Sequence, residues 1–235
     1  MDKGKIIVLE GLDGCGKSTQ LELAGKYIGE LGTRGRTVSF PNYDSHSGEI
    51  ISGYLLGEIP CDGENGAYAA STFYTADRYI SYVTDWKRDY DEGAVILSGR
   101  YTTSNAVYQM TKIPDERRKA FLSWLWDYEY NKLGLPKPDL VIFLDMPVEV
   151  SQNLLLKRYN GDVSKKDIHE KNVSFMKKCR ESALFAAEEC GWATVSCAEN
   201  GQALPIEAIH RAICGHVKDV VEHGGIEVQK NRDNG

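Results

Sequence analysis

The chain has no long hydrophobic run and no excess of positive charge. Its 235 residues include 28 Lys and Arg against 34 Asp and Glu, which gives a net charge of −6. An acidic balance disfavours general attraction to nucleic acid or to anionic membranes. Apolar runs such as 140–144 are far shorter than the roughly 20 residues that cross a bilayer as a helix. We therefore expect a protein that binds neither nucleic acid nor membrane.

The sequence is also poor in disulfide and metal-binding patterns. Its six cysteines, at positions 15, 61, 179, 190, 197 and 214, show no C-x-x-C spacing. Its five histidines show no ligand spacing. Scattered thiols are typical of a reducing compartment. Because no apolar signal region with a cleavage site follows Met1, we expect a cytoplasmic protein with free thiols.

What the chain does contain is an alternation of short apolar runs with longer helical patterns. The predicted strands are 6–9, 37–40, 94–97, 140–144 and 192–197; the predicted helices are 17–31, 48–56, 67–90, 102–109, 115–133, 148–159, 173–189 and 205–221. This alternation predicts an α/β fold in three layers, α/β/α, around a five-stranded parallel sheet. We expect a single domain over residues 1–222, with a polar segment at about 159–171, and a polar C-terminal tail over 223–235.

The first predicted strand leads into a glycine-rich loop. The loop fills the pattern G-x-x-x-x-G-K-[ST] between a strand and a helix, and it reads Gly11-Leu12-Asp13-Gly14-Cys15-Gly16-Lys17-Ser18-Thr19. Glycines let backbone N–H groups turn toward phosphate oxygens, and the helix N-terminus adds a favourable dipole. Lys17 can reach the β- and γ-phosphates, and the Ser18 hydroxyl can ligate Mg²⁺. We predict that these residues bind ATP; a glycine-rich turn that merely caps a helix is the alternative.

Residues just beyond the predicted strands are candidates for ligand binding, because ligands of a parallel sheet bind outside the carboxyl ends of its strands. Phe40-Pro41 follows the second strand, Arg100-Tyr101 follows the third, and Asp145 ends the fourth. Tyr74 and Arg78 lie four residues apart on a predicted helix and share a face. A ring beside a guanidinium suits a nucleobase and its phosphate. A surface Arg stacked on its neighbouring Tyr would give the same spacing.

Together these motifs resemble the thymidylate kinase family, whose members phosphorylate dTMP with ATP. The resemblance covers roughly residues 5–214. It depends on motifs in a fixed order, namely 9–19, Phe40-Pro41, 73–78, Arg100-Tyr101, Ser104-Asn105, Tyr108-Gln109 and 138–147. The phosphate loop alone occurs in many NTPases, whereas Asp13 within it and the downstream residue pairs are found in far fewer families. The resemblance implies the P-loop NTPase fold, ATP and Mg²⁺ as cofactors, and a homodimer.

The resemblance also implies roles for individual residues. Asp13 matches a residue that contacts the nucleotide sugar, Tyr74 an aromatic that stacks on thymine, and Arg78 a residue that binds the monophosphate and contacts the base. Arg100 matches a second monophosphate ligand between donor and acceptor, and with Asp13 and Lys17 it belongs to the catalytic set. Further acceptor-pocket residues implied in this way are Phe40, Pro41, Asn105, Tyr108 and Gln109.

The catalytic cation is expected from a lid, which the resemblance places at about residues 159–171. Some family members carry an Arg in the phosphate loop, where this chain has Gly14. Members without that Arg supply the cation from the lid, which here implies Arg158, Lys165 and Lys166. Asp167 and Glu170 fall where the lid often carries acids.

One departure from the family pattern concerns the metal. Members usually carry an Asp where this chain has Gly99, directly before Arg100. That carboxylate helps to hold Mg²⁺ through water. Glu10, Asp13 and Asp145 are nearby acids that could take over part of its work, although Asp145 could equally cap the following helix.

Other functions fit parts of the pattern, and one of them is a kinase of the same fold that acts on a different nucleotide monophosphate. A deoxynucleoside kinase of the same fold needs a carboxylate base, for which Glu10 is the obvious candidate. A nucleotide-binding protein with little catalysis is consistent with Gly99. Finally, Trp124 and Trp126 on helix 115–133 indicate either core packing or a dimer face.

Overall fold

The computed structural model describes residues 3–158 and 172–223. Within them, five strands form one sheet in the order β2-β3-β1-β4-β5, and every neighbouring pair is parallel. The strands are β1 (Lys5–Gly11), β2 (Gly35–Val38), β3 (Val95–Ser98), β4 (Leu140–Asp145) and β5 (Ala193–Ser196). The predicted α/β fold with a five-stranded parallel sheet is confirmed.

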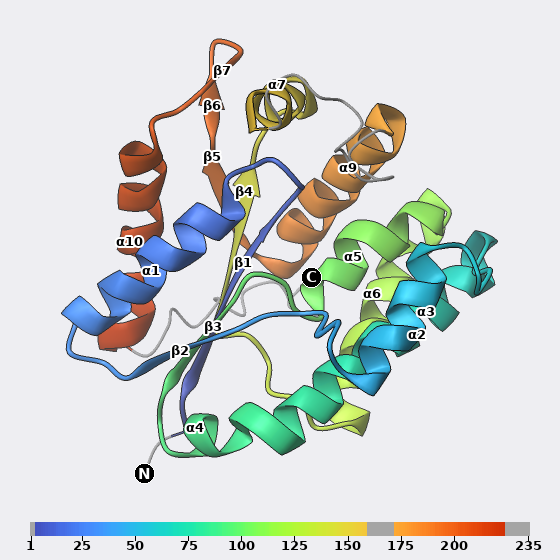
Figure 1. Cartoon of the computed structure of the whole chain (residues 1–235), viewed down its shortest axis with the longest axis horizontal. Helices are drawn as coiled ribbons and strands as arrows, with labels where there is room; N and C mark the ends of the chain where they lie inside the picture. Colours follow the sequence, from blue (N-terminus) through green and yellow to red (C-terminus); the bar gives the residue numbers. More distant parts are fainter. Residues whose placement is uncertain (1–2, 159–171, 224–235) are drawn as a thin grey trace, which may run out of the picture.

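Helices cover both faces of this sheet (Figure 1). The α-helices are α1 (Lys17–Glu30), α2 (His46–Leu55), α3 (Gly63–Ser81), α4 (Lys87–Asp91), α5 (Thr103–Tyr108), α6 (Arg118–Trp126), α7 (Val148–Arg158), α9 (Val173–Cys190) and α10 (Ile206–His223). Two 3-10 segments are η2 (Gln109–Lys112) and η3 (Asp115–Arg117), and two π-helical segments are η1 (Tyr82–Trp86) and η4 (Asp127–Lys132).

The strands are apolar on both sides because each side packs against a helical layer. Ile7 and Leu97 belong to the core that includes residues of α1 and α10, whereas Ile6 and Ile96 pack with Trp86 in the core on the other face. In Figure 1, α1 and α10 lie together on one side of the sheet, and α3, α5, α6 and α9 lie on the other. The alternation along each strand thus produces the three predicted layers.

Several boundaries differ from the sequence prediction. The second strand occupies 35–38 instead of 37–40, so Phe40-Pro41 lies in the loop after it. The predicted helix 67–90 starts earlier, at Gly63, and changes to a π-helical turn at Tyr82. The predicted helix 115–133 divides into η3, α6 and η4. The spacing of hydrophobic residues predicts which face of a helix is buried. It does not predict whether the helix has α, 3-10 or π hydrogen bonding, because that pattern changes locally with side-chain packing.

A short antiparallel hairpin was not predicted. β6 (Ala198–Glu199) pairs with β7 (Gln202–Ala203) around Asn200-Gly201, and both turn residues have positive φ. Asn-Gly is the strongest short-range hairpin signal in a sequence, so the information was present. The hairpin lies far along the chain from the predicted site residues.

Candidate active site

The phosphate loop joins β1 to α1, as the motif predicted. Gly14 and Gly16 have φ values of 80° and 85°, a conformation that side chains rarely adopt. Gly16 is the N-cap of α1 and offers no side-chain cap, so the first N–H groups of the helix face outward. This is the arrangement that binds phosphate oxygens in other proteins.

Lys17 lies at the start of α1 and bends back over the loop. Its Nζ donates a hydrogen bond to the Gly11 carbonyl at 2.8 Å. Burial and the nearby Arg100 lower the pKa of Lys17, because both disfavour its charged form. The site therefore concentrates positive charge that an anionic ligand would stabilise.

The nine residues that the sequence predicted for the acceptor all line one cavity of about 440 Å³ beside the phosphate loop. They are Asp13, Phe40, Pro41, Tyr74, Arg78, Arg100, Asn105, Tyr108 and Gln109. These residues come from loops and helices far apart in the sequence. The carboxyl ends of the parallel strands bring them together.

Arg100 connects the phosphate loop to this cavity. Its Nη2 donates to Asp13 Oδ1 at 2.8 Å, and its guanidinium carbon lies 4.9 Å from the centroid of the Tyr108 ring. Burial opposes the charge, but the ring of Tyr108 and the carboxylates of Asp13 and Glu10 outweigh it, so the pKa of Arg100 lies above its ordinary value. Arg100 is thus charged at any working pH and links Asp13 of the phosphate loop to the cavity.

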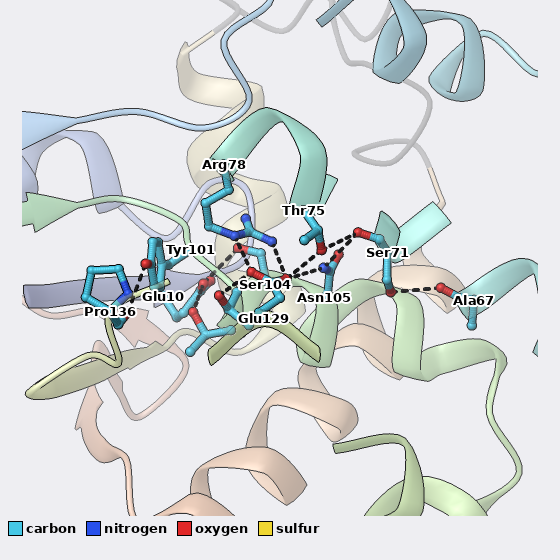
Figure 2. A network of polar contacts seen from close by, with 12 residues as sticks. Glu10, Ala67, Ser71, Thr75, Arg78, Tyr101, Ser104, Asn105, Glu129 and Pro136 are labelled. Atoms are coloured by element: carbon cyan, nitrogen blue, oxygen red, sulfur yellow. Dashed lines mark hydrogen bonds and ion pairs between the residues drawn. The ribbon is translucent and has the colours of Figure 1, made fainter. Parts of the chain in front are cut away.

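Arg78 is buried instead of lying on the surface, and its main partner is Glu129. Nε and Nη2 of Arg78 donate to the two carboxylate oxygens of Glu129, both at 2.7 Å (Figure 2). Arg78 also lies 5.9 Å from the Phe40 ring and 5.5 Å from the Tyr101 ring. The alternative of a surface Arg stacked on Tyr74 is therefore wrong, because Arg78 is buried and contacts other rings. Glu129 compensates the charge of Arg78 as Asp13 does that of Arg100, and the binding of the monophosphate by Arg78 stays a prediction.

Tyr74 on α3 also lines the cavity. Its ring meets the Tyr54 ring edge-on, with centroids 6.2 Å apart. Burial raises the pKa of Tyr74, so it stays neutral. Tyr54 itself lines the cavity, and its hydroxyl donates to Gln109 Oε1 at 3.2 Å.

A model of the thymidylate kinase family matches residues 9–213. The chain belongs to the thymidylate kinase family. It is 32% identical to a probable thymidylate kinase of Thermococcus gammatolerans over 225 residues, which are 94% of this chain and 99% of that protein. It is 30% identical to the thymidylate kinase of Plasmodium falciparum over 94% of this chain and 91% of that one. For the enzyme of Mycobacterium tuberculosis the identity is 29% over 77% of this chain and 84% of the relative.

The match confirms the predicted family and the expectation of an enzyme, a kinase that transfers phosphate. ATP is the phosphate donor in the thymidylate kinase family. In the described residues, no helix is long and apolar enough to cross a membrane.

The acids near the family's missing Asp already have partners, although the Oε2 atom of Glu10 is buried without a hydrogen bond in the described part of the chain. Glu10 is fully buried at the end of β1, and its Oε1 accepts hydrogen bonds from Thr103 at 2.6 Å and Ser104 at 2.7 Å. Asp145 accepts from Arg180 at 2.7 and 2.9 Å, so it ties β4 to α9 instead of capping α7. Within residues 3–158 and 172–223, no group of three or more His, Cys, Asp or Glu is placed to hold a metal.

Glu10 is also poorly placed to be a nucleoside kinase base. It is not among the residues that line the acceptor cavity, and its Oε1 accepts from the hydroxyls of Thr103 and Ser104 on α5. A general base must come within hydrogen-bond reach of the acceptor hydroxyl. The deoxynucleoside kinase alternative therefore loses its candidate base.

Several residues in and behind the cavity were not predicted from the sequence. Lys112 donates to Tyr54 Oη at 2.9 Å, to the Cys61 carbonyl at 3.0 Å and to Gln109 Oε1 at 3.1 Å. Glu129 was not singled out either. A lone charged residue in an otherwise helical pattern reads as solvent-exposed, and only the fold reveals that these two are turned inward.

Asp77, next to Arg78, has a structural task. Its carboxylate accepts from the backbone N–H of Asn42 at 3.0 Å and from the Ser47 hydroxyl at 2.8 Å. These bonds hold the loop after β2 against α3. Phe40 and Tyr43 of that loop line the cavity as a result.

Most of the predicted lid lies outside the described residues. Lys165 and Lys166, with Asp167 and Glu170, lie outside the described residues, and Arg158 is the last residue of α7. Gly14 has no room for the alternative Arg, since an added Cβ would lie 2.8 Å from Leu155 Cγ and 3.0 Å from the Ser151 carbonyl oxygen.

Proposed function

We propose that Lys17, Asp13 and Arg100 form the centre of a dTMP kinase site, in which the phosphate loop binds ATP and the adjacent cavity binds dTMP. The Asp13–Arg100 contact carries this assignment, because it joins the two halves at 2.8 Å. Phosphoryl transfer depends mainly on positioning and charge neutralisation. A nucleotide monophosphate is already an anion near neutral pH, so no general base is required.

In this proposal Arg100 binds the acceptor phosphate, and Tyr74 and Phe40 provide ring surfaces for the base and sugar. Arg78 and Asn105 contact the edge of the base. Gly11 to Thr19 surround the ATP phosphates, and Lys17 neutralises charge that develops on the transferred group. Arg158, Lys165 and Lys166 stay the predicted lid cations.

Mg²⁺ fits the site through Ser18. Ser18 is an exposed residue at the N-terminus of α1, and bound phosphates would supply most of the other oxygen ligands, as Mg²⁺ prefers. The ion would neutralise phosphate charge during transfer. We include Mg²⁺ as a cofactor on this basis.

We also propose that the protein is a cytoplasmic homodimer. The sequence suggested the aromatic helix 115–133 as a dimer face, but Trp124 packs on Tyr68 with centroids 4.6 Å apart, and Trp126 stacks on Tyr130. Large exposed apolar side chains of the described part instead include Ile50 on α2, Ile80 on α3 and Val83 on η1. α2 packs beside α3, so these helices are the better candidates for the interface.

The experiment that tests the proposal is an ADP-release assay with ATP, Mg²⁺ and a panel of acceptors, namely dTMP, dUMP, UMP, AMP, CMP and thymidine. We expect rapid turnover with dTMP and weaker turnover with dUMP, because one methyl group contributes only about 1–3 kcal/mol of discrimination. Faster turnover of thymidine than of dTMP would contradict the acceptor assignment. Binding without turnover would support the weakly catalytic alternative.

A further inference from the structure

The carboxylate of Glu129 lies at the centre of a buried polar network behind the acceptor cavity (Figure 2). Its side chain is fully buried. Oε1 accepts from Thr75 at 2.8 Å and from Arg78 Nη2 at 2.7 Å, and Oε2 accepts from Arg78 Nε and Thr102, both at 2.7 Å. Every neighbour named here donates, as an acceptor-only carboxylate requires.

The local structure explains how Glu129 reaches this position. It lies in the π-helical turn η4, which continues α6. Such turns are rare and occur often at functional sites, because they re-aim a side chain that a regular helix would place elsewhere. Here the turn carries Glu129 under both α3, which holds Thr75 and Arg78, and α5, which holds Asn105.

Asn105 is oriented by this carboxylate. Its Nδ2 donates to Glu129 Oε1 and to the Ser71 carbonyl, both at 3.4 Å. Two acceptors thus face one side of the amide, which directs the NH₂ group toward them. The carbonyl oxygen Oδ1 is then the end left for the cavity that Asn105 lines, and it presents an acceptor there.

Arg78 is oriented in the complementary sense. Nε and Nη2 of Arg78 donate hydrogen bonds to Glu129. The remaining nitrogen of the guanidinium, Nη1, is therefore left for the cavity that Arg78 lines. Nη1 presents donors only. The base edge of the cavity therefore offers one donor and one acceptor, and both are set by the same carboxylate.

We propose that Glu129 is a positioning residue that makes the acceptor cavity select a 4-keto pyrimidine over a 4-amino pyrimidine. A thymine ring carries an acceptor at O4 and a donor at N3–H, which complements Arg78 Nη1 and Asn105 Oδ1. A cytosine ring carries a donor amino group at position 4 and an acceptor at N3, so it opposes both. This inference rests on the proposed function, because it assumes that the cavity binds a pyrimidine monophosphate.

The primary test is Glu129→Gln, measured as the ratio of kcat/KM for dTMP to that for dCMP. The Gln amide must put an NH₂ group against an Arg78 donor, and it lets Asn105 reverse. We expect the ratio to fall about tenfold or more, since unpaired polar groups in a binding site dominate discrimination. Thr102→Val is the control, because it removes one hydrogen bond to Glu129 and keeps the acceptor pattern; its ratio should equal that of the wild type.

A second variant keeps the proposal testable if Glu129→Gln does not fold. Asn105→Asp places a carboxylate oxygen against Glu129 and should lose most dTMP turnover. In the double variant with Glu129→Gln, the amide NH₂ at position 129 can donate to the carboxylate at position 105, and that carboxylate stays near Arg78. The double variant should therefore recover dTMP turnover. A double variant no better than Asn105→Asp would overturn the proposal.

The outcomes separate this inference from the proposed function. If the wild type turns over dTMP but Glu129→Gln lowers dTMP and dCMP turnover equally, Glu129 has a merely structural role and the inference is wrong, while the proposed function stands. If the wild type does not turn over dTMP, the proposed function fails, and the inference fails with it.

Discussion

Arg100 and Asp13 form an ion pair of 2.8 Å although they are 87 positions apart in the sequence. Asp13 belongs to the loop after β1, and Arg100 follows β3, which pairs with β1 in parallel. Neighbouring parallel strands end at the same edge of the sheet, so their following loops meet. The sheet thereby places an acceptor-side cation directly beside the phosphate loop.

Replacement of Arg100 by Ala should impair the acceptor much more than the donor. We expect kcat/KM for dTMP to fall about 10²–10³-fold, because a positioned charge on the reacting phosphates is lost, while KM for ATP changes about threefold at most. Steady-state kinetics with each substrate varied in turn measures this. Arg117→Ala is the matched control, because Arg117 forms an exposed ion pair with Glu64. An unchanged dTMP turnover in Arg100→Ala would contradict the acceptor assignment.

Replacement of Lys17 by Met should separate activity from stability. We expect turnover to fall about 10²–10³-fold. In the folded protein the pKa of Lys17 lies below its ordinary value because of burial and Arg100. The charge of Lys17 therefore destabilises the folded state fully at pH values below the folded-state pKa. This destabilisation shrinks as the pH rises from the folded-state pKa toward the ordinary pKa of about 10.5.

The melting temperature of Lys17→Met minus that of the wild type should therefore decrease between pH 7 and pH 10, without nucleotide. Thermal unfolding followed by circular dichroism at several pH values gives this difference. Lys26→Met, on the exposed side of α1, is the control. A difference that grows with pH would mean that the pKa of Lys17 is raised in the folded protein.

The two glycines of the phosphate loop should respond differently to Ala. Both have positive φ, which costs about 1–2 kcal/mol for a residue with a side chain. At Gly14 the new Cβ would also collide with Leu155 and Ser151 of α7. At Gly16 nothing lies within 4 Å of the new Cβ. We expect Gly14→Ala to lower the free energy of unfolding by about 1–3 kcal/mol more than Gly16→Ala does. Urea denaturation measures both. Equal losses would show that α7 can move aside, and the loop would then also have room for an Arg.

Restoring the family's carboxylate at position 99 should strengthen the binding of Mg²⁺. A Cβ on Gly99 would lie 3.1 Å from Leu21 Cδ2, the far end of a flexible side chain, so the cost in stability should stay below about 1 kcal/mol. We expect Gly99→Asp to lower the Mg²⁺ concentration for half-maximal activity about threefold or more. Gly99→Asn has the same shape without the charge and should leave it unchanged. Equal behaviour of the two variants would show that a carboxylate here does not assist Mg²⁺.

Much of this site could be predicted from the sequence, because its parts follow short apolar strands. A buried strand such as 140–144 is recognisable from local composition, and the residues after it must lie at the ligand-binding edge of a parallel sheet. For the same reason Phe40 and Arg100 could be expected at this edge before the fold was known, whereas Asn105 was expected there only from the resemblance to the thymidylate kinase family.

The partners of those residues could not be predicted in the same way. The spacing of Tyr74 and Arg78 shows that they share a helical face, but it does not reveal that Glu129, 51 positions further on, compensates the charge of Arg78. Such a pairing depends on how helices cross and on a π-helical turn, which hydrophobic periodicity does not encode. Lys112 and Arg180 were missed for the same reason.

The measurement that tests the central claim most directly is ³¹P NMR of the wild-type protein with ATP, Mg²⁺ and dTMP. The proposed site predicts that ATP and dTMP disappear together and that ADP and dTDP appear in equal amounts. Formation of ADP and inorganic phosphate with dTMP unchanged, or no reaction at all, would contradict it.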